Sequence, residues 1–187
     1  MEGSLQLVEK DVDIRDIRIE ILSQLPVFKE NTARQRTIKA QRETESVFLR
    51  SAERRGKSDV ALEDIHDCTP TGYSADYPLT MGWIEAFAER TGGAIGRALL
   101  AKLPPFGRVF RHTDVGEYYR VRDRFHLVIY SPNGTSMVCG GQQVLANEAE
   151  LWWLNNKKPH ESFNPTQDYR IHLIFDLLGA QWRPIAA

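Results

Sequence analysis

The segments RFHLVIY at residues 124–130 and RIHLIFD at residues 170–176 alternate apolar side chains with arginine and histidine. This alternation is typical of β-strands, whose successive side chains point to opposite faces of a sheet. The apolar residues should face packed helices, which turns Arg124 and His126, and likewise Arg170 and His172, toward the other face. We therefore expect these side chains to point into a barrel interior. A purely structural barrel would place apolar residues there, because burying guanidinium groups without partners is costly.

Other short strands surround these two segments in the second half of the chain. The sequence SPNGT at residues 131–135 is typical of a hairpin turn, and the apolar run LWWL at residues 151–154 predicts a short strand. Helices followed by many antiparallel strands predict an α+β, mainly β protein whose strands close into a sandwich or barrel. We expect a single domain over residues 1–187, with barrel strands at about 106–180.

The first half, at about residues 1–105, is expected to contribute packing helices and a strand. Apolar spacing predicts a helix at residues 14–25, ended by Pro26, and the segment at 44–50 has strand propensity. Residues 54–77 are rich in charged and small residues and are expected to form a loop. A second helix is predicted from Thr80, whose hydroxyl can cap it, to just before Pro104. Its apolar stripe would include Ile95, Leu99 and Leu100.

Charge and composition exclude several classes of partner. The net charge of -1 gives no electrostatic reason to expect nucleic acid or an anionic membrane surface. The basic residues between Arg34 and Arg55 are interrupted by acidic ones, which favours a solvated face over a binding patch. The sequence shows neither a signal peptide nor an apolar run long enough to span a bilayer, so we expect no membrane partner. Cys68 and Cys139 form no C-x-x-C motif, and we expect a cytoplasmic protein.

Three residues have the character of a metal site. His112 and Asp114 should lie on one side of an extended strand, and His160 can complete the set from a neighbouring strand. Two imidazoles and one carboxylate hold Fe(II) on one face and leave its other positions open. A His-x-acid motif alone is common by chance, so its context matters. Here Arg170 follows His160 by ten residues on a predicted strand, where it could bind a dicarboxylate cosubstrate.

Taken together, these pieces resemble the aspartyl/asparaginyl beta-hydroxylase family of Fe(II)- and 2-oxoglutarate-dependent oxygenases. The resemblance covers roughly residues 31–178. It is carried by four pieces: His112-Thr-Asp114, the segment at 122–127, the segment leading from Gly140-Gly141 to His160, and the segment at 170–176. The family is built on a double-stranded β-helix, which is a jelly-roll, cupin-like barrel. The resemblance therefore implies the same fold that the alternation of residues predicts.

The resemblance also implies roles for individual residues. His112 and His160 would be iron ligands, and Arg170 would hold the distal carboxylate of 2-oxoglutarate. Arg124 and His126 match positions that line the cosubstrate and substrate pocket, and Arg122 matches a position suited to a substrate carboxylate. Some members of the family have no carboxylate where this chain has Asp114, so here the ligand triad looks complete.

The implied function is a 2-oxoglutarate-dependent dioxygenase with Fe(II), 2-oxoglutarate and O2. It would hydroxylate a C–H bond of an amino-acid-like or peptidyl substrate of the Asp/Asn type, with release of succinate and CO2. The partner would be a small molecule or peptide that carries a carboxylate. Two alternatives stay open: a non-catalytic jelly-roll module that binds metal or ligand, and a cupin-type metalloenzyme that does not use 2-oxoglutarate. Arg170 argues against the second, since such an enzyme needs no dicarboxylate anchor.

Overall fold

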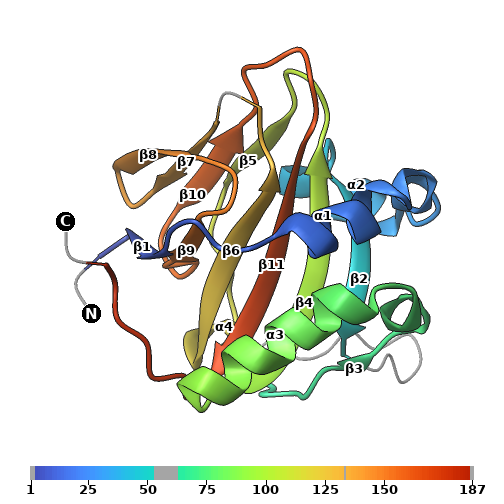
Figure 1. The fold of residues 1–187 in the computed structure, drawn as a ribbon. Coiled ribbons are helices and arrows are strands. Elements are labelled where there is room, and N and C mark those ends of the chain that lie inside the picture. The colour runs from blue at the N-terminus through green and yellow to red at the C-terminus, as the bar shows by residue number, and fades with distance from the viewer. Residues whose placement is uncertain (1–2, 53–62, 133, 186–187) are drawn as a thin grey trace.

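The computed structural model describes residues 3–52, 63–132 and 134–185. In this part of the chain the strands form two antiparallel sheets, which contact each other through an apolar cluster that includes Val128 and Leu154 of one sheet and Met137 and Cys139 of the other (Figure 1). The seven-stranded sheet has the order β1 (Leu5–Glu9), β9 (Leu151–Leu154), β6 (Arg122–Tyr130), β11 (Arg170–Leu178), β4 (Ala94–Leu103), β2 (Glu45–Ser51), β3 (Thr69–Pro70). The four-stranded sheet has the order β5 (Arg108–His112), β10 (His160–Phe163), β7 (Thr135–Cys139), β8 (Gln142–Ala146). This mainly β jelly roll confirms the predicted fold class.

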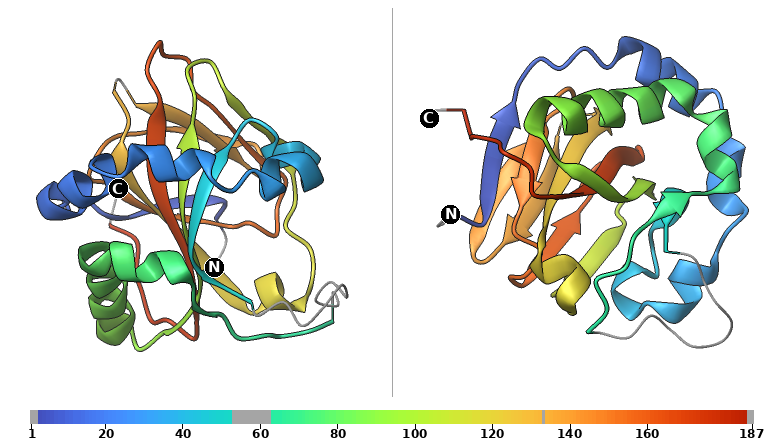
Figure 2. Two further views of the ribbon diagram at one scale, coloured as in Figure 1. Left: turned by 90° about the vertical axis from the view of Figure 1, so that its right-hand side faces the viewer. Right: turned by 90° about the horizontal axis from the view of Figure 1, so that it is seen from below.

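Helices cover the outer face of the larger sheet. The α-helices are α1 (Arg15–Leu22), α2 (Ala33–Thr37), α3 (Pro78–Thr91) and α4 (Glu117–Arg120), and the 3-10 helices are η1 (Leu25–Lys29), η2 (Lys39–Gln41) and η3 (Gly72–Asp76). Figures 1 and 2 show α1 and α3 lying across that face. The main apolar core lies between them and the sheet, and it contains Phe125, Leu127, Leu173 and Phe175. The predicted alternation of β6 and β11 is therefore confirmed.

The predicted helix from Thr80 to Pro104 is wrong in its second half. The helix α3 ends at Thr91, and Gly92 follows it with a φ of 67°, a left-handed conformation that glycine adopts readily. The next residues form strand β4, which pairs with β11 and β2. Leu99 and Leu100 fit a helical stripe by their spacing, but they lie on opposite faces of this strand. Local spacing could not separate the two structures, because strand pairing with distant segments decides between them.

The start of α3 also differs from the prediction. The helix begins at Pro78, and the Thr80 hydroxyl does not cap it. The cap comes instead from Glu20 on α1, whose carboxylate accepts hydrogen bonds from the backbone N–H groups of Leu79 and Thr80 at 2.8 and 2.9 Å. The Thr80 hydroxyl donates to the same carboxylate at 2.6 Å. A helix N-terminus that takes its cap from another helix has no signal in the local sequence.

The earlier segments follow the predictions more closely. The first helix ends at Leu22, and Pro26 lies in the first turn of η1, where its missing N–H costs nothing. The strand expected at residues 44–50 is confirmed by β2. Within the loop expected at 54–77, residues 54–62 lie outside the described part, and the remainder contains β3 and η3. No helix in the described ranges is long and apolar enough to cross a bilayer.

We predict that Glu20→Ala lowers the free energy of unfolding by about 1 to 2 kcal/mol, because three donors at the start of α3 lose their acceptor. Urea denaturation at neutral pH measures the change. Glu85→Ala is the matched control, because Glu85 is an exposed residue of α3 itself. Equal denaturation midpoints for the two variants would contradict the capping role.

Candidate active site

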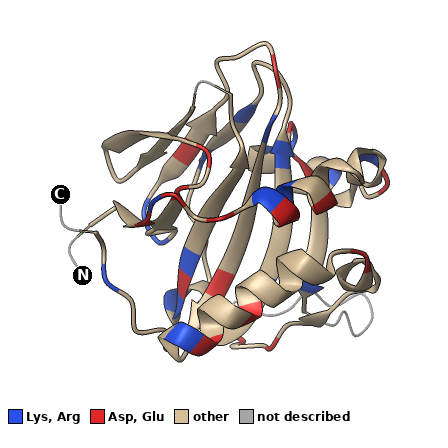
Figure 3. Cartoon of the chain, viewed as in Figure 1, with Lys and Arg blue, Asp and Glu red and all other residues tan. Residues whose placement is uncertain are grey.

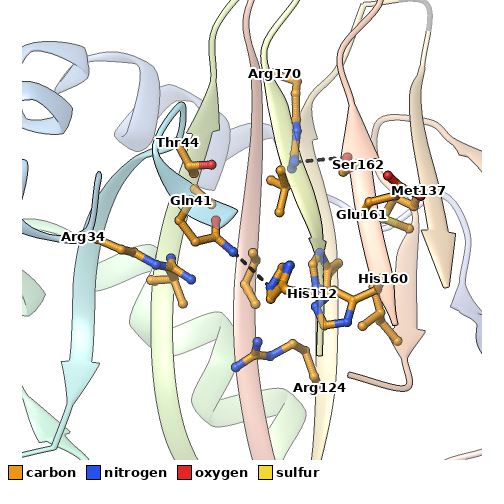
Figure 4. A pocket seen from close by; sticks show the side chains of 16 residues that line it. Arg34, Gln41, Thr44, His112, Arg124, Met137, His160, Glu161, Ser162 and Arg170 are labelled. Carbon is orange, nitrogen blue, oxygen red and sulfur yellow. Dashed lines mark hydrogen bonds between the residues drawn. The ribbon is translucent and has the colours of Figure 1, made fainter. Parts of the chain in front are cut away.

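Three of the four polar residues predicted to face the barrel interior line a pocket there, whereas His172, the fourth, is buried but is not among the lining residues. Arg124 and His126 reach it from β6, and Arg170 reaches it from β11. Strand β4 adds Leu99 and Ala101, and β10 adds His160 and Ser162 (Figure 4). The pocket has a volume of about 570 Å³ when the space at its open mouth is counted.

His112, Asp114 and His160 come together as predicted. Each offers one ligand atom, and these atoms lie within 4.8 Å of one another. His112 is the last residue of β5, and it is the register partner of His160 on β10. Asp114 lies beyond the end of the strand, where its backbone N–H donates to the Asn156 carbonyl at 3.0 Å. His112 and Asp114 were predicted to lie on one side of a single strand. In the structure the strand ends at His112, and the segment that follows it brings Asp114 close.

Hydrogen bonds fix the tautomers of both histidines. His112 Nδ1 lies 2.7 Å from the Phe110 carbonyl oxygen, and His160 Nδ1 lies 2.9 Å from the Lys158 carbonyl oxygen. Because a carbonyl oxygen only accepts, each Nδ1 carries the hydrogen and each Nε2 keeps a free lone pair. Burial lowers the pKa of His160 to about 4, so its ring is neutral at pH 7. A neutral ring with a free Nε2 is the form that binds a metal ion.

The Asp114 carboxylate is held by one of its two oxygens. Asn156 Nδ2 donates to Oδ2 at 3.0 Å, and Arg124 Nη1 donates to the same oxygen. The other oxygen, Oδ1, lies 3.8 Å from His112 Nε2. Burial alone would raise the pKa of Asp114, but the nearby charge of Arg124 and the Asn156 hydrogen bond outweigh it and lower the pKa to about 2. The carboxylate is therefore ionised, and one oxygen remains available to a metal.

This donor set fits Fe(II). Two neutral imidazole nitrogens and one carboxylate oxygen form the facial set that non-haem iron oxygenases use, with the remaining positions open for other ligands. The hydrogen bonds of His112, His160 and Asp114 also have the form expected around a metal, because each candidate ligand is oriented by a hydrogen bond to its other polar atom.

Arg170 is a buried cation that lacks an anionic partner among the described residues. Its side chain is 3% exposed, and its Nη2 donates only to the Ser162 hydroxyl at 3.3 Å. Its Nε and Nη1 are buried and have no hydrogen-bond partner in the same part of the chain. Burial lowers the pKa of Arg170 to about 10. A carboxylate that enters the pocket would stabilise this buried guanidinium, because its two oxygens can accept hydrogen bonds from the free donors of Arg170.

Arg124 is equally buried, but its donors are already used. Its Nε and Nη2 donate to the two Asp176 oxygens at 2.8 and 2.9 Å, and its Nη1 donates to Asp114. Charged positions within the central strands β6 and β11 are visible in Figure 3. The side chain borders the pocket, as predicted, while its guanidinium serves to hold the Asp114 carboxylate in place.

Of the two remaining predicted site residues, His126 reaches the pocket and Arg122 does not. His126 lines the pocket, and its Nε2 is buried without a partner in the described ranges, while its Nδ1 lies 3.5 Å from His172 Nδ1. Arg122 is not among the residues that line this pocket. It is buried farther along β6, where its guanidinium donates to the backbone carbonyls of Tyr118 and His66 at 3.3 and 3.1 Å.

Sequence reasoning missed the wall formed by the N-terminal segment. Arg34 of α2, Gln41 of η2 and the adjacent Thr44 line the pocket. Gln41 Nε2 lies 3.3 Å from His112 Nε2, as a donor facing that free lone pair would. Arg34 begins the basic segment that we expected to be a solvated face, and for this residue the expectation is wrong. The only sequence signal was the clustering of basic residues, and it does not specify which of them turns inward.

Comparisons with known proteins agree with this geometry. A model of the aspartyl/asparaginyl beta-hydroxylase family matches residues 13–180. The chain therefore belongs to the aspartyl/asparaginyl beta-hydroxylase family, and it is a 2-oxoglutarate-dependent dioxygenase of the hydroxylase type. The resemblance stated from the sequence is thus confirmed. No curated protein sequence gives a significant match.

Several solved structures share the fold. A prolyl hydroxylase from Trichoplax adhaerens, in complex with a hypoxia inducible factor peptide, is 12% identical over 95% of this chain and 84% of its own, with a TM-score of 0.55. A prolyl-4-hydroxylase from Pseudomonas putida is 14% identical over 95% and 93%, with a TM-score of 0.54. The viral collagen prolyl hydroxylase of Paramecium Bursaria Chlorella virus-1 is 7% identical over 97% and 98%, with a TM-score of 0.53. At these identities the likeness concerns the fold alone.

We predict that the metal-free protein loses stability as the pH falls from 7 to 5, partly through His172. Burial holds the pKa of His126 and His172 well below the usual value. The unfolded chain therefore binds protons first, below about pH 6.5, and the free energy of unfolding decreases as the pH falls. Urea denaturation of His172→Gln should show a slope smaller by about 1 kcal/mol per pH unit between pH 6 and 5. An unchanged slope would mean that His172 does not titrate in this way.

Proposed function

We propose that this protein binds Fe(II) and 2-oxoglutarate in the pocket described above and hydroxylates a C–H bond of a small-molecule or peptidyl substrate, of the amino-acid-like Asp/Asn type, that carries a carboxylate. The observation that carries the proposal is the position of Arg170. Its buried guanidinium lacks an anionic partner among the described residues, and it lines the same pocket as His112 and His160. Membership of the hydroxylase family supports the same conclusion.

In this proposal the metal is held by His112, Asp114 and His160, and the distal carboxylate of 2-oxoglutarate is held by Arg170 with the Ser162 hydroxyl. When bound, Fe(II) with 2-oxoglutarate and O2 supplies the oxidative decarboxylation that yields succinate and CO2 and delivers one oxygen atom to the substrate.

The chain itself orients these groups and limits water. The Nδ1 hydrogen bonds keep the ligand nitrogens aimed at one point, and Arg124 keeps the carboxylate ionised. The His126 ring stays neutral, so its free Nε2 can donate to or accept from the cosubstrate without adding charge. Leu99 and Ile174 add apolar surface to the pocket wall, which would limit the water that remains there when the substrate is bound.

The two alternative functions receive less support. A cupin-type metalloenzyme that does not use 2-oxoglutarate has no need of a buried arginine whose free donors are suited to a carboxylate ligand. A non-catalytic binding module would be favoured by the loss of a ligand. Here the three candidate ligands are brought within reach of one ion.

We predict that the protein without oxygen binds Fe(II) and then, on addition of 2-oxoglutarate, develops the weak visible absorption band of a chelated iron complex. His160→Ala should abolish the band, because one of three ligands is lost. Arg170→Gln should leave Fe(II) binding intact but raise the dissociation constant of 2-oxoglutarate at least about tenfold, the equivalent of a lost charged hydrogen bond.

Arg111→Gln is the matched control, because Arg111 is an exposed arginine of strand β5 in the same barrel. It should bind 2-oxoglutarate as the unchanged chain does. Iron binding without the band would overturn the cosubstrate assignment and favour the cupin-type alternative. Absence of iron binding would favour the non-catalytic module.

A further inference from the structure

We propose that Arg34 binds a carboxylate of the substrate, at a second anion site distinct from the one at Arg170. The inference rests on the proposed function, and it specifies how that site recognises its substrate. Arg34 belongs to the short helix α2, outside the barrel, yet its side chain lines the pocket, and Figure 4 shows its guanidinium turned toward the metal-ligand group.

The guanidinium of Arg34 has donors to spare. Its one side-chain hydrogen bond in the described part of the chain runs from Nη1 to the Ser46 hydroxyl at a long 3.4 Å. The group also lies over the Phe48 ring, 5.6 Å from its centroid. No carboxylate of the described residues forms an ion pair with it, whereas Arg124 has two such partners. A positively charged fork with free donors, at the edge of a pocket, is suited to bind a carboxylate bidentately.

The charges around Arg34 also favour an anion. Burial lowers the pKa of Arg34 to about 10, and the nearby positive charges of Arg124 and Arg97 act in the same direction. The Asp114 carboxylate acts in the opposite direction, but it is already paired with Arg124. Arg34 thus lies near other cations and has no carboxylate partner of its own among the described residues.

The two proposed anion sites, at Arg170 and at Arg34, lie in different parts of the pocket. In Figure 4, Arg170 enters the pocket from one end, while Arg34 approaches from the side of α2 with Gln41 next to it. Seen from His112 in this view, the two guanidinium groups lie in different directions, Arg34 toward α2 and Arg170 toward the other end of the pocket. A dicarboxylate held at Arg170 therefore leaves Arg34 free for a second molecule. That molecule would place its carboxylate at Arg34 and a C–H bond near the metal ligands.

The test uses the full chain with Fe(II) and 2-oxoglutarate, without oxygen. The probes are the free L-amino acids and their α-carboxamides, together with N-acetyl-aspartyl amide and N-acetyl-asparaginyl amide. Isothermal titration calorimetry measures binding, and the change in the visible iron band reports whether a probe reaches the metal. We expect one or more carboxylate probes to bind, and the matching amide to bind at least about tenfold more weakly.

Arg34→Gln should weaken carboxylate binding at least about tenfold while the band and the 2-oxoglutarate affinity stay unchanged. Arg34→Lys keeps the charge but loses the planar fork, so its carboxylate affinity should lie between those of the unchanged chain and Arg34→Gln. Arg36→Gln is the matched control, because Arg36 is exposed on the same helix. Equal thermal unfolding midpoints for the Arg34→Gln and Arg36→Gln variants would exclude a folding defect.

The outcomes separate this inference from the proposed function. Absence of the iron band in the unchanged chain would overturn the proposed function and the inference with it. A normal band, with acid and amide bound equally or with Arg34→Gln binding as the unchanged chain does, would overturn the role of Arg34 alone. A normal band with no binding of any carboxylate probe would also overturn it, since the panel covers the proposed class.

Discussion

The ion pairs of Arg124 are the constraint on which the site depends. Arg124 on β6 and Asp176 on β11 are neighbours across two paired strands, and both side chains are buried. The same guanidinium also reaches Asp114, which lies in the turn after β5 of the other sheet. A buried ion pair adds little net stability, but removal of one partner leaves an unpaired charge and is expensive. The network therefore fixes where the Asp114 carboxylate, a candidate metal ligand, lies and keeps it ionised.

Arg124 and Arg170 are both buried in the barrel, but they differ in how far their hydrogen-bond donors are satisfied. Both guanidinium groups are buried inside the barrel, one satisfied by two carboxylates and the other bound only to a hydroxyl. The unsatisfied donors of Arg170 make the ligand-free protein less stable than it could be. An anion that binds them removes this cost, so ligand affinity and protein stability are linked. A protein that only needed a stable core would gain by an apolar residue at this position.

The sequence predicted the barrel and most of its polar interior because alternation along β6 and β11 is strict. Alternation assigns a side chain to a face, but it does not say how far along the barrel that side chain lies. Arg122 and Arg124 share a face of β6, yet the structure places one against Tyr118 and His66 and the other at the pocket. The use of Arg124 to hold Asp114 also depended on strand register, which local patterns do not contain.

The same limit explains why β4 and Arg34 were missed. The segment at residues 94–103 is apolar at helical spacing, and only its pairing with β11 and β2 makes it a strand. Arg34 comes to the pocket because the N-terminal segment packs across the open edge of the barrel near His112, which no short-range pattern records. His112, Asp114 and His160 could be singled out from the sequence as candidate ligands because their residue types are ones that bind metals, and the structure brings them close together.

Two parts of the chain contribute different residues to the pocket. The barrel strands and the turn after β5 supply the candidate metal ligands and Arg170, all of them held by sheet register or by buried ion pairs. The segment that contains α2 and η2 supplies Arg34 and Gln41, and it contributes no strand to that part of the wall. If Arg34 binds the substrate as proposed, changes in α2 and η2 would alter which substrate is held, while the candidate metal ligands would stay held by the two sheets.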